Sequence, residues 1–568
     1  MSDPVRLKGV AASMGVAVGT ARVLAWGRRR ISFRRITQGQ VASEIDRFRA
    51  AVAASHAEIE VARQELAQQH GATYASILDA YLLMHGDALL IDATCDTIRE
   101  ENINAEWAVS RVAERLKAPL LRDGSSYFRE RARDVDHVKE HLLRELCGED
   151  RTELPGQGPV VLIAHDLTPA DAVQMLAPPT VGLVTEVGGG SSHTAILART
   201  FGVPAVVGVG SVPIEIEDDQ DVVVDGFGGQ VIIGASRRER SQAEARRDRF
   251  LAFLDAERDR SAVTLDGTSI SVAANMELPS ELEAALASGA DGIGLYRTEF
   301  MCLNRPEPPS EDEQLDIYRT IAAALAPSKV IFRTFDWRRD KRPAGFDMGE
   351  DQAGWLRTQI KAVLRASEWG HVALMFPMVA TVRELLDAKI LVEQCRSELG
   401  ERGAPCASLQ VGMMVEVPSA ALMAEGFARH ADFFAVGTND LAHYTLAVDR
   451  HGNQASAGAN PLDPAVLRLL ERTVRAAGDA GIPCSMCGDM AAHPLALSLA
   501  LGLGYREISV PIRLLPLARA VVRSVDIELA GPLAHDALSC ESAEDVRLLV
   551  TDRMGEGFDP AWIRQEAV

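Results

Sequence analysis

The sequence predicts a multidomain α/β protein whose C-terminal half is a (β/α)8 barrel. Three observations support this prediction. The first part of the chain has a long helical pattern, the next has short apolar runs between turns, and the last has eight apolar runs separated by helical stretches. A chain of 568 residues has room for roughly two to four domains of about 150 residues each.

Residues 37–147 have the spacing of amphipathic helices. Val41, Ile45 and Phe48 recur every three or four positions, as on one buried face of a helix. Residues 57–100 add eight carboxylates against two arginines. Such a charge run is typical of a solvated helical face, and it also suits a docking face for a basic protein. The residues alone leave both interpretations open.

Short apolar runs replace the helical pattern from residue 155. They read PVVLIA, VGLVTE, AVVGVG, DVVVDG and QVIIGA, and they alternate with helical stretches near 169–177 and 194–200. The first 25 residues also predict short strands and turns. This alternation indicates a compact α/β domain, and the highly charged stretch 236–261 predicts a helical connector behind it.

Eight further apolar runs follow residue 261, and helical stretches separate most of them. Strands that are buried on both faces and alternate with helices are typical of a (β/α)8 barrel. Such barrels carry their active sites at the C-terminal ends of the strands. The polar residues directly after the apolar runs are therefore the candidate site: Asn275, Arg297, Arg333, Glu416, Asn439, Asp440 and Cys487.

A glycine-rich stretch, GGGSSHTAILART at residues 188–200, places His193 at a predicted junction between a loop and a helix. The unpaired N–H groups and the dipole of a helix start favour an anion there, and glycines let other groups approach the backbone closely. His193 therefore either faces a bound anion or is satisfied by local hydrogen bonds.

Arg297, Arg333 and Arg450 would bring three permanent cations to one mouth of the barrel. Guanidinium groups bind phosphate and carboxylate through paired hydrogen bonds, although each arginine alone could instead form a surface ion pair. Glu416 and Asp440 supply oxygen ligands suited to Mg²⁺, which takes one or two carboxylates together with phosphate oxygens. Pairing of these carboxylates with the same arginines is the alternative.

Cys487 ends the motif CSMC at residues 484–487. No second motif of this kind and no histidine pair at zinc-finger spacing accompanies it, so a zinc site is not expected. A thiol with an ordinary pKa of about 8.5 stays mostly protonated at neutral pH and can donate a proton to a carbanion. The residues alone thus indicate that a phosphorylated carboxylate binds in the barrel with a metal.

Composition argues against several classes of protein. The net charge of −21 disfavours nucleic acid and anionic membrane surfaces as partners. No apolar run approaches the roughly 18 residues that a membrane span needs, and no signal peptide is evident. The eight cysteines are scattered rather than arranged as a secreted disulfide framework, so we expect a cytoplasmic protein.

Five motifs in a fixed order carry a family resemblance: GGGSSHTAILAR, GIGLYRTEF, VGMMVEVPSAA, FFAVGTNDL…YTLAVDR and MCGDMA. Together they resemble Enzyme I of the phosphoenolpyruvate-dependent sugar phosphotransferase system over almost the whole chain. The resemblance implies a swivelling phosphohistidine α/β domain at 1–30 and 148–235, with a helical insertion at 31–147 that binds the phosphocarrier HPr. It further implies a helical linker at 236–261, and a TIM barrel at 262–568 that binds phosphoenolpyruvate and Mg²⁺ and forms a homodimer.

The resemblance also implies the reaction and the residues that perform it. The phosphoryl group passes from phosphoenolpyruvate to His193 and then to a histidine of HPr, and pyruvate is released. Cys487 protonates the enolate at C3. The implied substrate residues are Arg297, Arg333, Asn439, Asp440 and Arg450. The implied metal ligands are Glu416 and Asp440, and Lys341 adds positive charge nearby.

This chain departs from the family pattern at several positions. Gly190 and Ser191 stand where Arg-Thr is usual, and Trp337-Arg338-Arg339 stand where a glycine pair is usual. His443 and Asp489 replace Gln and Glu. The segment between Lys341 and Leu356 is short and lacks an expected Asn-Pro-x-x-Gly-x-Arg element.

Two other functions remain as alternatives. One is a regulatory paralogue that binds phosphoenolpyruvate or HPr with weak turnover. The other is a relative of pyruvate phosphate dikinase or phosphoenolpyruvate synthase, which would carry a large ATP-binding domain before the histidine domain. The roughly 150 residues that precede the α/β segment here have a helical pattern and contain no glycine-rich phosphate loop.

Overall fold

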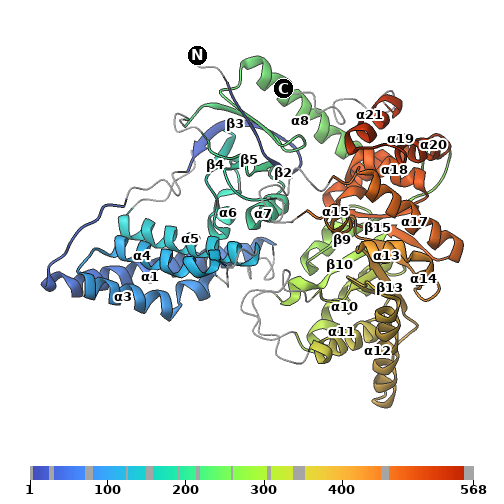
Figure 1. The fold of residues 1–568 in the computed structure, drawn as a ribbon, viewed down its shortest axis with the longest axis horizontal. Coiled ribbons are helices and arrows are strands. Elements are labelled where there is room, and N and C mark those ends of the chain that lie inside the picture. The colour runs from blue at the N-terminus through green and yellow to red at the C-terminus, as the bar shows by residue number, and fades with distance from the viewer. Residues whose placement is uncertain are drawn as a thin grey trace. The chain divides into compact units, whose positions relative to one another are not determined.

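The computed structural model describes residues 4–24, 31–70, 78, 81–122, 126–148, 158–189, 192–212, 216, 218–257, 260–302, 309–336, 352–448 and 460–554. The chain divides into two compact units, with the boundary between Phe250 and Leu251 (Figure 1). Each unit has hydrophobic clusters of its own.

The first unit contains an eight-stranded sheet in the order β1-β8-β7-β3-β4-β5-β6-β2. Its strands are β1 (Val5–Lys8), β2 (Val10–Ser13), β3 (Val16–Val23), β4 (Val160–Ala164), β5 (Thr180–Thr185), β6 (Ala205–Val207), β7 (Asp221–Asp225) and β8 (Gln230–Ile233). Strands β3 to β6 pair in parallel. The five apolar runs between residues 155 and 235 form strands β4 to β8, as predicted.

Strand β4 shows why these runs are continuously apolar. Leu162 packs into a cluster with Ala172 and Leu197, which belong to the helices α6 (Pro169–Met175) and α7 (His193–Phe201). The next residue, Ile163, packs into a second cluster on the other face with Val184. Both faces of the strand are covered, so neither face can be polar.

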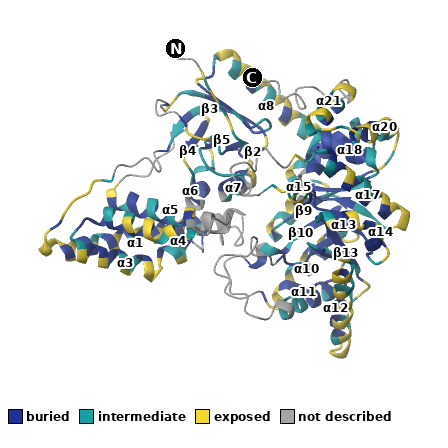
Figure 2. Cartoon of the chain, viewed as in Figure 1, coloured by how far each residue is buried: buried dark blue, intermediate teal, exposed yellow. Residues whose placement is uncertain are grey.

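Within the described ranges, four long helices lie in the chain between β3 and β4: α1 (Val41–His70), α3 (Ala88–Glu101), α4 (Ala105–Arg122) and α5 (Ser126–Cys147). They pack around a shared cluster that includes Phe48, Ile98, Val109 and Leu142. Buried and exposed positions alternate along them (Figure 2), as the helical periodicity of the sequence predicts. The predicted connector contains the helix α8 (Arg237–Glu257).

The second unit is built on a closed barrel of eight parallel strands. These strands are β9 (Ser271–Met276), β10 (Gly292–Arg297), β11 (Lys329–Arg333), β12 (His371–Phe376), β13 (Gln410–Val415), β14 (Phe434–Val436), β15 (Cys484–Met486) and β16 (Glu507–Pro511). The predicted (β/α)8 barrel is thereby confirmed.

Helices alternate with the strands of the barrel and continue after the last strand. They are α9 (Leu282–Ala287), α10 (Glu311–Leu325), α11 (Gln352–Ala366), α12 (Val382–Glu401), α13 (Pro418–Leu422), α14 (Ala424–Ala428), α15 (Thr438–Leu446), α17 (Pro464–Ala480), α18 (Pro494–Leu503), α19 (Leu515–Ser524), α20 (Ile527–Ala537) and α21 (Ala543–Met554). Within the described ranges, none of the helices is both long and apolar enough to cross a membrane.

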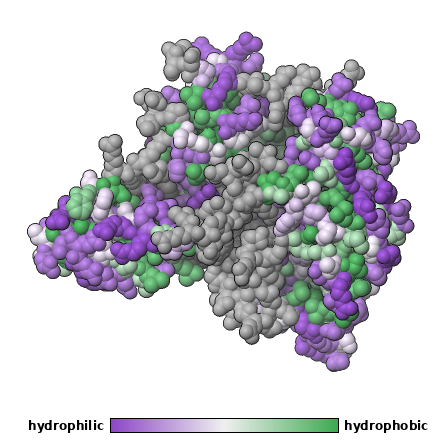
Figure 3. All heavy atoms as spheres, viewed as in Figure 1, coloured by the Kyte–Doolittle hydropathy of each residue, from purple (hydrophilic) through white to green (hydrophobic). Residues whose placement is uncertain are grey.

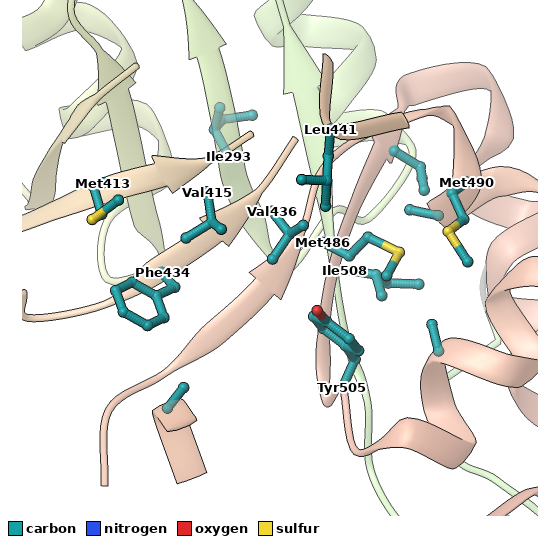
Figure 4. Packing of buried hydrophobic residues seen from close by; sticks show 14 of the residues in the cluster. Ile293, Met413, Val415, Phe434, Val436, Leu441, Met486, Met490, Tyr505 and Ile508 are labelled. Carbon is teal, nitrogen blue, oxygen red and sulfur yellow. The ribbon is translucent and has the colours of Figure 1, made fainter. Parts of the chain in front are cut away.

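The barrel strands are buried from both sides. Met413, Phe434 and Val436 belong to the large cluster between strands and helices (Figure 4). Met414, the residue after Met413, belongs instead to a smaller cluster that also includes Cys487. Since the apolar part of each strand fills these two layers, polar residues appear where the strands end, and all of those ends lie at one mouth of the barrel.

Candidate active site

All seven polar residues predicted for the site lie at the same end of the barrel. Asn275 is the next-to-last residue of β9, while Arg297 and Arg333 end β10 and β11. Glu416 directly follows β13, and Cys487 directly follows β15. Asn439 and Asp440 are in the first turn of α15, which follows β14. Parallel strand pairing in a closed barrel brings the residues of this set to one mouth.

Cys487 is held by strands on both sides of it. Its backbone N–H and its thiol both donate to the carbonyl oxygen of Val436, at 3.0 and 3.5 Å. The side-chain amide of Asn275 donates to the carbonyl oxygen of Cys487 at 3.2 Å. Asn275 is in turn fixed by the hydroxyl of Ser509, which donates to its Oδ1 at 2.6 Å. The position of Cys487 thus depends on β9, β14 and β16.

The thiol of Cys487 stays protonated at neutral pH. Burial raises the pKa of Cys487 to about 12, and the nearby Glu416 carboxylate contributes to the rise. Arg333 and Arg297 act in the opposite direction and lower the pKa of this thiol. The group is therefore a proton donor whose conjugate thiolate would form beside two cations.

Glycine at position 488 allows the start of α15 to approach Cys487. A Cβ at Gly488 would overlap the hydroxyl of Thr438 and lie 2.8 Å from the Thr438 backbone nitrogen. It would also lie 2.9 Å from Oδ1 of Asn439. The close approach puts the predicted substrate residue Asn439 next to the strand end that carries the thiol.

Both described arginines of the site are paired with carboxylates. Arg333 is buried and donates to Oε1 of Glu299 at 2.8 Å. Burial lowers the pKa of Arg333, but the carboxylates of Glu299 and Glu416 outweigh this effect, and its pKa is raised. Arg297 is more exposed and donates to Oε1 of Glu277 at 2.6 Å. These ion pairs orient the guanidinium groups at the mouth, and each guanidinium has further N–H donors.

Glu277 and Glu299 are not among the site residues predicted from the sequence. Each stands two residues after a predicted site residue, Asn275 and Arg297 respectively, and so belongs to the same strand ends. The rule that selected the other candidates, a polar residue just after an apolar run, would have selected these two as well.

Glu416 and Asp440 are buried carboxylates at neighbouring strand ends, with 1% and 6% of their surfaces exposed. Oε1 of Glu416 accepts a hydrogen bond from the backbone N–H of Met378 at 2.7 Å. A Cβ at Gly437 would lie 3.1 Å from Oε2 of Glu416, so the absence of a side chain leaves room for this carboxylate.

This pair of carboxylates fits Mg²⁺ in the chemistry of its donors. Hard oxygen ligands in small number are what Mg²⁺ uses when substrate phosphate oxygens complete its coordination. Within the described ranges, no group of three or more His, Cys, Asp and Glu residues could hold a metal by itself.

His193 is the first residue of α7, as the predicted junction of loop and helix requires. Ser192 caps this helix, because its hydroxyl oxygen accepts from the backbone N–H of Ala195 at 3.2 Å. The side chains of His193 and Asp489 lie outside the described part of the structure. So do Arg450, Lys341, Gly190 and residues 337–339.

Three family models match this chain in order. A model described as the N-terminal domain of PEP-utilising enzymes matches residues 8–131. The mobile domain of PEP-utilising enzymes matches residues 156–229, and the PEP-binding domain matches residues 252–527. The mobile-domain match contains His193, and the PEP-binding match contains the polar residues of the barrel mouth from Asn275 to Cys487.

Curated relatives match along nearly the full length. A phosphoenolpyruvate-protein phosphotransferase of Staphylococcus carnosus is 36% identical, over 96% of this chain and 99% of that protein. Proteins of the same name from Geobacillus stearothermophilus and Staphylococcus aureus are 37% and 34% identical, over 96% of this chain and 98% and 99% of their own lengths. The chain therefore belongs to the family of phosphoenolpyruvate-protein phosphotransferases, the Enzyme I family that its motifs resemble.

Proposed function

We propose that this protein transfers the phosphoryl group of phosphoenolpyruvate to its own His193, then to a histidine of HPr, and releases pyruvate. The observation that carries the proposal is the setting of Cys487. It is a buried, protonated thiol at the mouth of the barrel, close to two arginines and a carboxylate. This arrangement supplies what the breakdown of a phosphorylated enol requires: cations for the phosphate and carboxylate, and an acid for the carbon.

The first step is binding. Arg297 and Arg333 hold the phosphate and carboxylate of phosphoenolpyruvate through charge-assisted hydrogen bonds, and Arg450, Asn439 and Asp440 complete the contacts. Glu416 and Asp440 would hold Mg²⁺, which supplies charge neutralisation for the phosphoryl oxygens when it is bound.

The second step is transfer. A neutral ring nitrogen of His193 forms a bond to phosphorus in line with the bridging oxygen, and the P–O bond breaks with its electron pair going to the enolate. The Cys487 thiol then gives its proton to C3, which converts the enolate into pyruvate. Arg297 and Arg333 stabilise the thiolate that remains until solvent reprotonates it.

The two reacting residues belong to different units of the chain. We therefore infer that the phosphohistidine domain (1–30 and 148–235) moves on the linker (236–261) between the barrel (262–568) and HPr. The helical segment (31–147) is our candidate for the HPr surface, and its visible face carries mostly hydrophilic residues (Figure 3). By analogy with the family we also propose a cytoplasmic homodimer formed through the barrel unit.

Labelling with ³²P-phosphoenolpyruvate tests the proposal. The wild-type protein should acquire an acid-labile, base-stable label and pass it to HPr repeatedly without ATP. His193→Ala should acquire none, and labelling of this variant at the wild-type level would overturn the assignment. Label that enters His193 but leaves it only slowly in the presence of HPr would favour a regulatory paralogue. A requirement for ATP would favour a dikinase or synthase.

A further inference from the structure

The helix α5 presents a charged stripe to the α/β part of the same unit. His137, His141 and Arg144 follow one another at spacings of four and three residues, on one face of the helix. His137 Nε2 lies 3.1 Å from Oδ2 of Asp166, which belongs to the loop after β4. Arg144 donates to Asp171 of α6 at 3.0 Å, and His141 Nε2 lies 3.5 Å from the same carboxylate.

The Asp166 carboxylate continues this contact to the helix that begins at His193. Its Oδ1 accepts from the backbone N–H of Leu167 at 2.9 Å and from the hydroxyl of Thr194 at 3.4 Å. The Thr194 hydroxyl has one proton, which it shares between Oδ1 of Asp166 and the Leu167 carbonyl oxygen, the nearer acceptor at 3.2 Å. Thr194 is buried and directly follows His193 in the first turn of α7. The Asp166 carboxylate thus contacts α5 through His137 and α7 through Thr194.

The other ring nitrogen of His137 is engaged as well. The Tyr81 hydroxyl, from the helical turn before α3, donates to Oδ1 of Asp134 at 2.9 Å and lies 3.1 Å from His137 Nδ1. A hydroxyl has one proton, so a tyrosine that donates to Asp134 accepts from His137. His137 then donates from both nitrogens, to Tyr81 and to Asp166, and is an imidazolium.

The charges around His137 support this protonation state. Burial lowers the pKa of His137, but the hydrogen bond to Asp166 and the charges of Asp166, Asp134 and Asp171 raise it above its usual value. Among the residues that the structure describes, Arg133 on α5 is a further charged group that acts on Asp166, and it lowers the pKa of this carboxyl. The network is therefore complete only while His137 carries its second proton.

We propose that His137 is a positioning residue for phosphotransfer through His193. In its charged form it holds Asp166, and Asp166 together with Thr194 holds the first turn of α7. Loss of the proton leaves one N–H for two acceptors and releases either Tyr81 or Asp166. Phosphotransfer therefore falls as the pH rises through the pKa of His137. The inference rests on the proposed function, because it assigns a role in the phosphorylation of His193.

The test is the pH profile of single-turnover labelling by phosphoenolpyruvate in the full-length protein. The wild-type rate should rise with pH as His193 becomes neutral and then fall as His137 loses its proton. His137→Gln keeps a donor for Asp166 but has no charge, so its rate should drop roughly ten-fold, because misplacing a reacting group by about 1 Å can cost up to about a hundred-fold. Its falling limb should vanish.

Tyr81→Phe removes the acceptor of the second N–H, so the falling limb should move to lower pH. His56→Gln, an exposed histidine on α1, is the matched control and should keep the wild-type profile. In ¹⁵N-histidine spectra of the wild type at neutral pH, both ring nitrogens of His137 should be protonated. In Tyr81→Phe, His137 should lose its second proton at a lower pH than in the wild type, while the protein is still folded.

The outcomes separate the two proposals. If phosphoenolpyruvate does not label wild-type His193, the proposed function fails. If His193 is labelled but His137→Gln and Tyr81→Phe retain the wild-type pH profile, only the role of His137 is overturned. A neutral, singly protonated His137 ring at pH 6 in the folded wild type would overturn it as well.

Discussion

The side-chain amide of Asn275 donates to the main-chain carbonyl of Cys487 across 3.2 Å, although 212 positions separate the two residues. Asn275 is the next-to-last residue of the first barrel strand and Cys487 follows the seventh, so this bond fixes the proposed proton donor from outside its own strand. The bond connects no charged groups, so we expect it to affect the reaction by positioning the thiol rather than by electrostatics.

Replacement of Asn275 by Ala should therefore lower kcat more than it changes KM for phosphoenolpyruvate. It also leaves the Ser509 hydroxyl and the Cys487 carbonyl without their partner, which should cost about 1–3 kcal/mol of unfolding free energy. Ser509→Ala, which preserves the bond from Asn275 to Cys487, should lose less activity. Equal losses of activity in the two variants would contradict a positional role for Asn275. Steady-state kinetics and urea unfolding measure these effects.

Replacement of Cys487 by Ser should keep binding of phosphoenolpyruvate and slow pyruvate formation by roughly a hundred-fold, a typical contribution of a general acid. The reason is that a serine hydroxyl is a far weaker acid than a thiol, even one whose pKa burial raises to about 12. Stopped-flow detection of pyruvate gives the rate, and equilibrium dialysis gives the binding. Unchanged turnover would assign the proton to water or to another group.

Replacement of Gly488 by Ala should destabilise the barrel by about 1–3 kcal/mol, since the new methyl group overlaps the hydroxyl of Thr438 and also lies too close to the Thr438 backbone nitrogen, which cannot rotate away. The matched control is Gly478→Ala in α17, where nothing lies within 4 Å of the added Cβ. That variant should be neutral or slightly more stable, because Ala has the higher helix propensity. Thermal unfolding of both variants compares the sites, and equal melting temperatures would refute the close approach.

Replacement of Glu416 by Gln should raise the Mg²⁺ concentration that gives half-maximal turnover. Glutamine retains an oxygen that can accept from the Met378 backbone, so the local fold should persist while the anionic ligand is lost. Glu401→Gln, at an exposed position at the end of α12, serves as the control. An unaltered Mg²⁺ dependence in Glu416→Gln would remove this residue from the proposed ligand set.

Replacement of Asp171 by Asn should change how the first unit responds to acid. Burial raises the pKa of Asp171, but hydrogen bonds and charges from His141, Arg144 and Thr168 outweigh it and bring its pKa to about 2. A carboxyl whose folded pKa is depressed stabilises the fold above its unfolded pKa, near 4, and loses that contribution as the pH falls toward 2.

This contribution is on the order of 2 kcal/mol, since one unit of pKa corresponds to about 1.4 kcal/mol. The stability difference between wild type and Asp171→Asn should therefore be largest above pH 4 and shrink between pH 4 and pH 2. Denaturant unfolding at a series of pH values measures it, with the exposed Asp92→Asn on α3 as control. A difference that does not depend on pH would contradict the depressed pKa.

The sequence was informative about the barrel because its strands are covered on both faces and their apolar runs are uninterrupted. The same feature marked the site, since a polar residue such as Glu416 stands out directly after a run such as VGMMV. The partners of the site residues were not predictable in this way. The pairing of Arg333 with Glu299, or of Asn275 with Cys487, depends on which strands are neighbours and on their register.

The partners of the charged stripe on α5 could not be predicted from the sequence either. His137 and Asp166 are ordinary polar residues in the sequence, and no local pattern says that they meet. Their contact arises because the helical segment packs against the loop after β4, which is a property of the tertiary fold. The helical spacing of His137, His141 and Arg144 is visible in the sequence, but a solvated face would have the same spacing.

The topology of the sheet shows that the helical segment also connects two neighbouring strands. Strands β3 and β4 are neighbours that run parallel, with Thr20 paired to Val160, and the helices α1 and α3–α5 lie between them in the chain. Parallel neighbours need a crossover of a dozen or more residues, usually one helix. The segment proposed to recognise HPr is thus an enlarged crossover rather than an appendage. A shortened form of this protein could lose the recognition surface, but it would still need a helix to carry the chain from Val23 back to Val160.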